Sequence, residues 1–386
     1  MIAWYKKTVR EELGCKAVTS LLETNTSIEY NILRNDLDAV MRHSYHAHTT
    51  NRCTVQTQSS DLGSSARMLR AMYAGRLIGK PFLVNEYAAV YWNRYRYEEP
   101  FSVAAYASFL GFDLLLRHGS VVHFEHGDRI FPWIMHHDPI TRASQTAAAL
   151  LYARGDVREA EKEISLMVSE KEVREKGLWN NHFASSPQTK LAGGTELGAL
   201  IRRLKQEKLL TKDNRSDGIY RFENATRELY LDAARNFMTV DTPRFQGVAG
   251  EEKAKAVLRD VTLELRKNRG AVSVASLQKE KGIREANCLL VIYATNALCS
   301  KMTFEDPSMI HVLSYGENPV LIETGTVFLT LRNSHADKLK VYPLQINGRR
   351  GRPLETVTCK DGILQLTIDT HQLPEGPALF FELAEQ

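Results

Sequence analysis

The sequence predicts two kinds of structure: an α/β arrangement in the first part of the 386 residues and an all-β arrangement in the second. Two observations support this division. In the first part, short apolar runs alternate with helical patterns, which is typical of βαβ units and a parallel sheet. From Ser216 onward, short runs rich in β-branched residues follow one another, with turn signals such as Asn347-Gly348 between several of them. We therefore expect a parallel sheet followed by a two-sheet antiparallel sandwich.

The expected elements of the first part follow one another closely. The first fourteen residues predict a helix that ends at Gly14. Strands are expected over 17–22, 36–41, 81–84 and 120–124, and helices over 64–74, 101–116, 157–163 and 196–204. Four strand-helix units make only half of an eight-stranded barrel. The expected domains are a half-barrel over 1–160, a charged and irregular connection over 161–215, and a β-sandwich over 216–386.

The second part contains the expected strands of the sandwich. They cover 227–232, 237–241, 256–265, 270–277, 288–294, 319–323, 326–331, 339–346, 362–368 and 378–383. No catalytic constellation is visible among them. We expect this domain to pack against the first part of the chain rather than to act as an independent binding module.

Composition excludes several classes of protein. Hydrophobic residues make up 43% of the chain and charged residues 25%, which is ordinary for a globular protein and not for a disordered or collagenous one. The net charge is only +4 and the Lys and Arg residues are scattered, so we expect no nucleic-acid partner. The basic run 347–352 indicates a solvated hairpin tip. No apolar run has the length needed to cross a bilayer, so no membrane partner is expected.

Five cysteines, an odd number without CxxC pairs, describe neither a disulfide framework nor a zinc site. They indicate thiols in a reducing compartment, although a secreted enzyme with free cysteines is the alternative. The N-terminus lacks the apolar core and cleavage site of a signal peptide. The localisation is therefore left open, and a secreted or periplasmic parent remains compatible with the sequence.

Glu86 is the first candidate functional residue. It follows the apolar run 81–84 and precedes a loop rich in aromatic and cationic residues, among them Tyr87 and Trp92. Side chains at the carboxyl ends of barrel strands line active sites, and sugar rings bind to flat aromatic faces. The alternative is a structural ion pair between Glu86 and Arg94 or Arg96.

An ordered set of motifs resembles strands five to eight of a clan A retaining glycoside hydrolase. The set comprises His43-Ser-Tyr45, Pro81-Phe-Leu-Val-Asn-Glu86, Ala104-Ala-Tyr106, Gly111-Phe-Asp113, Phe131-Pro-Trp133 and Asp138-Pro139. The resemblance covers about residues 1 to 160, and it implies a partial (β/α)8 barrel. The β-rich second part is similar to the C-terminal sandwich of such hydrolases, including the segment 242–246, to which no chemical role is assigned.

The resemblance implies a retaining double-displacement mechanism with Glu86 as the nucleophile and no cofactor. It places His43 and Tyr45 beside this carboxylate, in one cleft with Trp133 on its wall. The expected substrate contacts are Asn25, His43, Tyr45, Tyr87, Trp92 and Trp133. The partner is an oligosaccharide or polysaccharide of unknown sugar and linkage.

One part of the family pattern is missing. The acid/base of the family is an Asn-Glu pair at the end of strand four, and this chain begins after that strand, so no acid/base is assigned. Glu23 and Glu125 are alternatives for the second carboxylate, and Asn85-Glu86 could itself be the strand-four pair. The chain therefore represents either an N-terminally truncated hydrolase or a non-catalytic, carbohydrate-binding or structural remnant of one.

Two further expectations concern metals and association. Histidines near strand ends, such as His43, His46 and His48, are residues of the kind that ligate metal ions. Their spacing matches no strong metal-binding motif, so no metal is expected. A half-barrel exposes the edges of its outer strands, 17–22 and 120–124. Such edges promote association, so the sequence predicts self-association through them or aggregation of a fragment.

Overall fold

The computed structural model describes residues 1–21, 23, 29–50, 52–64, 66–73, 75–119, 127, 129–133, 136–161, 221–223 and 226–385. Within these residues, no helix combines the length and the apolar character needed to span a membrane. The expected helix over 196–204 and the expected strand over 120–124 lie outside the described residues.

A parallel sheet forms the first part of the chain. It consists of β1 (Val40–His46), β2 (Phe82–Ala89) and β3 (Leu114–Arg117), paired in that order. Helices precede, link and follow these strands: α1 (Ile2–Lys7), a π-helical turn (Thr8–Glu12), α2 (Glu29–Arg34), α3 (Arg67–Tyr73), a 3-10 turn (Arg96–Glu98), a π-helical segment (Pro100–Ala105), α4 (Tyr106–Phe109), α5 (Pro139–Ala148) and a final π-helical turn (Ala149–Ala153). The sheet does not close into a barrel within the described residues.

Among the described residues of the second part, the regular elements are strands and one 3-10 turn (Ala233–Arg235). An eight-stranded sheet has the order β17-β20-β11-β10-β7-β6-β5-β4, and a five-stranded sheet has the order β18-β19-β16-β9-β8. Their strands are β4 (Arg221–Glu223), β5 (Leu229–Asp232), β6 (Phe237–Asp241), β7 (Phe245–Gly250), β8 (Lys255–Val257), β9 (Val261–Lys267), β10 (Gly270–Ser276), β11 (Cys288–Ala294), β16 (Thr326–Arg332), β17 (Lys340–Leu344), β18 (Val357–Lys360), β19 (Ile363–Asp369) and β20 (Phe380–Ala384).

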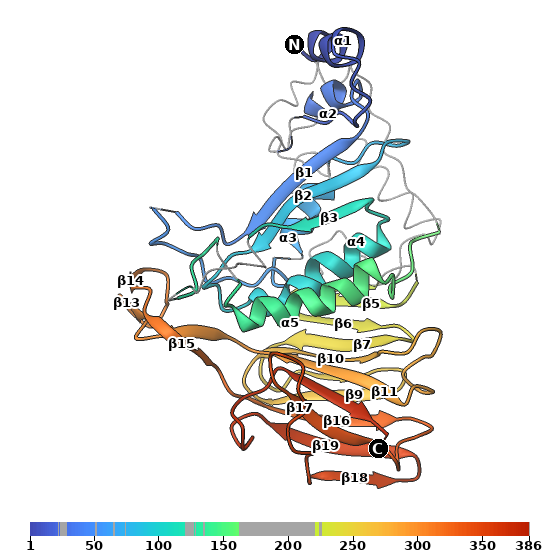
Figure 1. The fold of residues 1–386 in the computed structure, drawn as a ribbon, viewed down its shortest axis with the longest axis vertical. Coiled ribbons are helices and arrows are strands. Elements are labelled where there is room, and N and C mark those ends of the chain that lie inside the picture. The colour runs from blue at the N-terminus through green and yellow to red at the C-terminus, as the bar shows by residue number, and fades with distance from the viewer. Residues whose placement is uncertain are drawn as a thin grey trace.

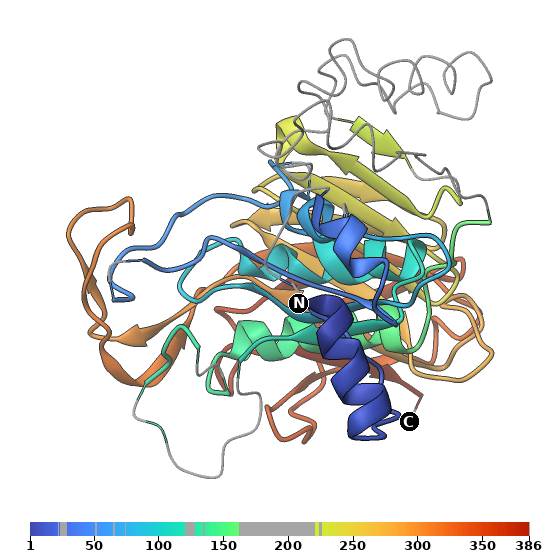
Figure 2. The same cartoon turned by 90° about the horizontal axis from the view of Figure 1, so that it is seen from above.

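Two small antiparallel pairs extend from this sandwich. They are β12 (Ala297–Ser300) with β15 (Glu317–Ile322), and β13 (Thr303–Phe304) with β14 (Val312–Ser314). In the view from above they project to one side of the molecule (Figure 2). The Trp92 ring packs against Phe304 and Tyr315 of this extension, so the loop after β2 is anchored to it.

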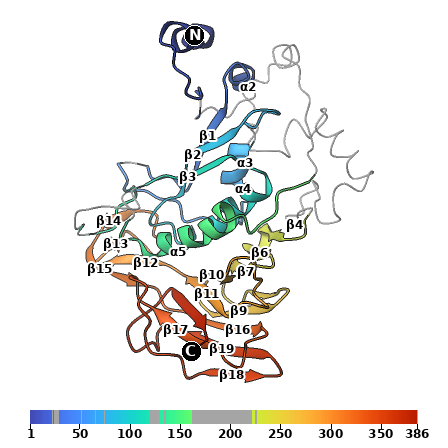
Figure 3. The ribbon, with the colours of Figure 1, turned by 45° about the vertical axis from the view of Figure 1, so that its right-hand side comes forward.

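The elements are stacked in layers along the long axis of the molecule (Figures 1 and 3). The five-stranded sheet lies at one end, followed by the eight-stranded sheet, the helices α4 and α5, and then the parallel sheet. The N-terminal helix α1 lies beyond the parallel sheet, at the opposite end from β18. The eight-stranded sheet is therefore covered on both faces, which explains why every residue of β10 is buried.

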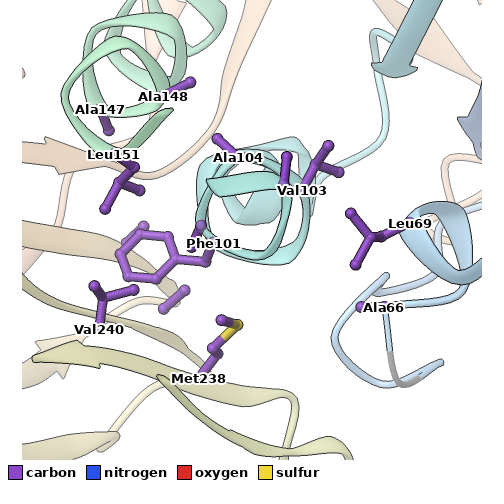
Figure 4. Close-up of a cluster of buried hydrophobic side chains, with 14 of the residues drawn as sticks. Ala66, Leu69, Phe101, Val103, Ala104, Ala147, Ala148, Leu151, Met238 and Val240 are labelled. Atoms are coloured by element: carbon purple, nitrogen blue, oxygen red, sulfur yellow. The ribbon is translucent and has the colours of Figure 1, made fainter. Parts of the chain in front are cut away.

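Two large apolar cores lie on the two faces of the eight-stranded sheet. Between the sheets, side chains such as Val272 and Val291 pack against Leu263 and Leu329. On the other face, Phe101 and Leu151 of the helical layer pack against strand residues such as Met238 and Val240 (Figure 4). The helical layer is joined to the sandwich by a continuous apolar core, whose burial supplies most of the stabilising free energy.

The expected strand over 17–22 is wrong for the residues described, because 17–21 form no strand. Instead, Thr19 is tied to Asp38: its peptide N–H and its hydroxyl donate to Oδ2 at 2.8 and 2.5 Å. Val18 is 65% exposed, so this run does not bury its apolar side chains as a sheet strand would.

Other boundaries in the first part also differ from the prediction. The strand expected over 36–41 runs over Val40–His46, and the strand expected over 81–84 continues to Ala89. The helix expected over 101–116 ends at Phe109, because Gly111 takes a positive φ of 63° and the chain then enters β3. The described residues of the expected helix 157–163 are not helical.

The second part follows the prediction more closely. Each of the ten expected strands overlaps an observed one, and the range 256–265 overlaps both β8 and β9. The prediction missed β4, β7, β12, β13, β14 and β18. The segment 242–246, which had no assigned role, leads into β7. Oε1 of Gln246 accepts hydrogen bonds from the peptide N–H groups of Asp260 and Val261 at 2.9 and 3.1 Å.

Candidate functional site

The candidate site lies near the carboxyl end of the parallel sheet, where β1 and β2 pair. His43 lies opposite Glu86 in the register, and Tyr45 lies two residues further along β1. Alternate residues of a strand share a face, so these three side chains project from one side of the sheet. The pairing thus brings together Tyr45 and Glu86, which are 41 residues apart in the sequence.

A bulge in β2 decides which way Glu86 faces. Arg42 of β1 pairs with Val84 of β2. The next residue, His43, pairs with Glu86, so Asn85 is an additional residue in β2. The pairing of β2 with β3 shows the same shift. Because one extra residue reverses the alternation beyond it, Glu86 faces away from the buried side that Val84 occupies.

The Glu86 carboxylate is held through one of its two oxygens. The Tyr45 hydroxyl donates a hydrogen bond to Oε2, and Nδ1 of His118 lies 3.4 Å from the same oxygen. Oε1 accepts no hydrogen bond from the residues that the structure describes. The Glu86 side chain is 33% exposed, so an outside molecule can reach this carboxylate.

Tyr45 acts as a proton-bearing donor in this contact. Partial burial, the hydrogen bond to Glu86 and the charge of that carboxylate raise the pKa of the Tyr45 hydroxyl far above its usual value. The phenol therefore keeps its proton over the whole physiological pH range. It can hold Oε2 without itself taking part in proton transfer.

Aromatic rings surround the bonded carboxylate. The Trp133 ring lies 5.3 Å from the Tyr45 ring and 5.3 Å from the His118 ring, in edge-to-face arrangements. His48 lies 5.1 Å from Trp133, and His43 lies 5.9 Å from Tyr45. We call this group the Glu86 cluster, and its members are His43, Tyr45, His48, Glu86, His118 and Trp133.

The backbone of His118 is held on both sides of the residue. Its peptide N–H donates to the carbonyl of Tyr87 at 2.9 Å, which continues the pairing of β3 with β2. Its own carbonyl accepts from Nη1 of Arg117 at 2.9 Å, and Arg117 is paired through Nε with Glu99 at 2.7 Å. These two hydrogen bonds fix the position of the His118 backbone, from which the imidazole extends.

The structure brings together four of the residues singled out from the sequence. Glu86, Tyr45, His43 and Trp133 converge as expected, although His43, Tyr45 and Glu86 lie within strands rather than after them. Asn25 lies outside the described residues.

Tyr87 and Trp92, the other two expected substrate contacts, do not join the cluster. Tyr87 is 2% exposed and belongs to the apolar core of the helical layer. Trp92 is completely buried, and its Nε1 donates to the carbonyl of Met309 at 2.7 Å. Both rings are therefore occupied by the protein itself and offer no face to a ligand.

The ion pair considered as an alternative for Glu86 is not formed. Arg96 pairs with Asp138 at 2.7 Å, and Arg94 donates to Gln58 and to the carbonyl of Ser308. For the second carboxylate, Glu125 lies outside the described residues. In the part of the chain that the structure describes, no carboxylate besides Glu86 itself is hydrogen-bonded to or ion-paired with the cluster.

Metal binding gains no support from the arrangement of the histidines. No group of three or more His, Cys, Asp or Glu side chains among the described residues has a geometry that could hold an ion. His46 is instead directed to Asp61, at 3.4 Å, and to the carbonyl of Ser59, at 2.7 Å. All five cysteines are free thiols.

Sequence reasoning missed the roles of His48 and His118. His118 was obscured because the run 114–116 was assigned to the end of a helix. A signal was present, since Gly111 separates that apolar run from the preceding helix, and a short apolar run after glycine is typical of a strand. A strand ending at Arg117 would have placed His118 beside Glu86.

Two cavities lie apart from the cluster. One, of about 410 Å³, is lined by residues that include Lys80 and Asp113, at the opposite ends of the strands. The other, of about 460 Å³, lies between α5 and the β17 region and includes Arg142 and Phe380. Neither is lined by a member of the Glu86 cluster.

Comparison with known proteins identifies no relative: no protein-family model, no curated protein and no solved structure matches this chain.

Proposed function

We propose that the Glu86 cluster is the sugar-binding and reacting centre of a retaining glycoside hydrolase-like protein, with Glu86 as the nucleophile. The observation that carries the proposal is the unequal bonding of the two carboxylate oxygens. Oε2 is engaged by Tyr45 and approached by His118, whereas Oε1 has no partner among the described residues. A carboxylate that is oriented through one oxygen keeps the other for attack.

In the proposed reaction, Oε1 attacks the anomeric carbon of the bound sugar, and the bond from that carbon to the leaving oxygen breaks. The electron pair of this bond passes to the leaving oxygen, which takes up a proton, and the sugar becomes an ester of Glu86. Water then attacks the same carbon, gives up a proton and releases the carboxylate, so the proton taken up in the first step is returned in the second. Throughout, the Tyr45 phenol stays protonated and holds Oε2, while Trp133 offers an apolar ring for the sugar.

The barrel relationship belongs to this proposal. Three parallel strands paired in chain order, with helical segments between them, are compatible with part of a (β/α)8 barrel. The cluster lies near the carboxyl ends of these strands, which is where barrels of this kind carry their active sites. A complete retaining site needs a second carboxyl group about 5 Å from the first.

The second candidate function is sugar binding without turnover. It is favoured by one observation: within the described residues, no second carboxylate is bonded to the cluster. Without an acid to protonate the leaving oxygen, natural glycosides would react extremely slowly. The aromatic and polar groups would still bind a sugar ring.

A trapping experiment tests the proposal without needing an acid. Dinitrophenyl glycosides that carry fluorine beside the anomeric carbon have a leaving group that departs without protonation, and their ester with a nucleophile persists. We expect one member of a panel of common sugars to add a single glycosyl group per chain, located on Glu86 by peptide mass spectrometry. Glu86→Gln should show no adduct.

Glu264→Gln is the matched control. Glu264 lies on β9 and is 31% exposed, close to the 33% of Glu86, so the charge change and exposure are alike. This variant should be modified on Glu86 as the wild type is. An adduct on another residue, or none with any sugar, would contradict the nucleophile role. Saturable binding of the same glycosides without an adduct would establish the second candidate function instead.

A further inference from the structure

We infer that His118 is a positioning residue that, together with Tyr45, holds Glu86 in the side-chain rotamer in which one carboxylate oxygen is engaged and the other faces the reacting sugar. This inference rests on the proposed function for the role of the carboxylate, although the arrangement itself can be measured without turnover. Nδ1 of His118 lies 3.4 Å from Oε2, the same oxygen that accepts from the Tyr45 hydroxyl. The two side chains thus approach one atom of the carboxylate.

Their origins on the sheet explain why two contacts are needed. Tyr45 comes from β1 and His118 follows β3, so they reach Glu86 from the strands on either side of β2. A single hydroxyl contact leaves the Glu86 side chain able to change rotamer about its Cα–Cβ and Cβ–Cγ bonds. A second group on the other side opposes that movement, so the carboxylate stays engaged in one rotamer.

The imidazole is well placed for this role. Its backbone is held by hydrogen bonds on both sides, at 2.9 Å each. Its ring lies edge-to-face with Tyr45 at 5.8 Å and with Trp133 at 5.3 Å. With a proton on Nδ1, which the Nδ1 tautomer and the imidazolium both provide, the ring can donate toward Oε2. At 3.4 Å the contact is long, and such contacts commonly tighten when a ligand is bound.

The test measures the conformation of Glu86 directly. The protein is labelled selectively at glutamate and tyrosine, and side-chain couplings of Glu86 and its proximity to the Tyr45 ring are read by NMR. We expect one rotamer in the wild type, averaging among rotamers in His118→Ala, and recovery of one rotamer in His118→Gln, whose amide can donate in place of Nδ1. One unchanged rotamer in His118→Ala would overturn the inference whether or not the protein is an enzyme.

His48→Ala is the matched control for this experiment. His48 is an imidazole of the same cluster, in ring contact with Tyr45 at 5.4 Å and Trp133 at 5.1 Å, but it forms no hydrogen bond or ion pair with the Glu86 carboxylate. It should leave the Glu86 rotamer single. If His48→Ala causes as much averaging of the Glu86 rotamer as His118→Ala does, loss of packing explains the effect, and the positioning role is rejected.

Trapping kinetics then separate this inference from the proposed function. If Glu86 is the nucleophile, His118→Ala should slow the bond-forming step about tenfold, with recovery in His118→Gln and no more than about a twofold change in glycoside binding. Trapping at an unchanged rate would contradict the inference and leave the proposed function standing. Absence of trapping in the wild type would contradict the proposed function, and the rotamer measurement would still decide the role of His118.

Discussion

Glu86 and Asp138 are two carboxylates of the first part of the chain with opposite surroundings. Asp138 is completely buried, and both of its oxygens accept from Arg96, at 2.7 and 3.0 Å, with further bonds from Thr141 and Ile140. Glu86 is one-third exposed and is held through Oε2 alone. A carboxylate whose two oxygens both accept hydrogen bonds from the protein stabilises the fold. A carboxylate with one oxygen that accepts none can still bind a ligand.

The Asp138 region joins the helical layer to the sandwich. Arg96 also donates to the side-chain oxygen of Asn296 at 2.6 Å and to the carbonyl of Ala297 at 2.8 Å, both beyond the end of β11. Burial opposes ionisation of Asp138, but Arg96 and the hydrogen bonds outweigh it and lower the pKa of this carboxyl. The ion pair therefore persists at physiological pH and connects three segments.

The largest predicted effect separates these two carboxylates by their contribution to stability. Asp138→Asn leaves the buried Arg96 without its counter-charge and should lower the free energy of unfolding by about 3–5 kcal/mol. Glu86→Gln should change it by no more than about 1 kcal/mol, because that carboxylate is partly exposed. Urea unfolding followed by circular dichroism measures both. Equal losses in the two variants would remove the distinction between a structural and a functional carboxylate.

Two tyrosines allow the same comparison for hydroxyl donors. Tyr45→Phe removes the donor to Oε2 and should slow trapping of Glu86 about a hundredfold, with a stability loss of about 1 kcal/mol or less. Tyr97→Phe is the matched control, since its hydroxyl donates to the carbonyl of Gly250 at 3.4 Å in the buried junction. It should cost a similar amount of stability and leave trapping unchanged. Equal slowing in both variants would mean that general loosening, not the bond to Oε2, limits the reaction.

The sandwich and the parallel sheet differ in how far the sequence could predict them. Strands such as Phe237–Asp241 and Cys288–Ala294 match their expected ranges, because their β-rich runs are bounded by turn residues. The convergence of Tyr45 with Glu86 was also predictable, since successive parallel strands pair and place their carboxyl ends together. For these features, the local pattern and the final packing agree.

The remaining features depend on tertiary structure that leaves little trace in one sequence. The bulge at Asn85 reverses the side of the sheet from which Glu86 projects. The pattern of apolar and polar residues in the sequence does not indicate this extra residue. The apolar character of Leu114–Arg117 does not by itself distinguish a strand from a helix, so the position of His118 depended on the weaker signal of Gly111 before the run. Tyr87 and Trp92 were expected at the site because they are aromatic, but aromatic rings fill cores as readily as they bind sugars.

The smallest predicted effect concerns Asp38, a carboxylate that is exposed and yet bonded. The hydroxyl and the peptide N–H of Thr19, with a contribution from Arg10, lower the pKa of Asp38 to about 2 from its ordinary value of 3.8. A lowered pKa means that the unfolded chain binds the proton more readily, so the stability from this group is present above pH 3.8 and is lost as the pH falls through about 2. Because the side chain is 38% exposed, the contribution should stay below about 0.5 kcal/mol.

Asp38→Asn should therefore be slightly less stable than the wild type at pH 5, and the two unfolding curves should converge near pH 2. A difference that remains unchanged at pH 2 would show that the asparagine side chain disturbs the Thr19 segment itself, independently of the charge.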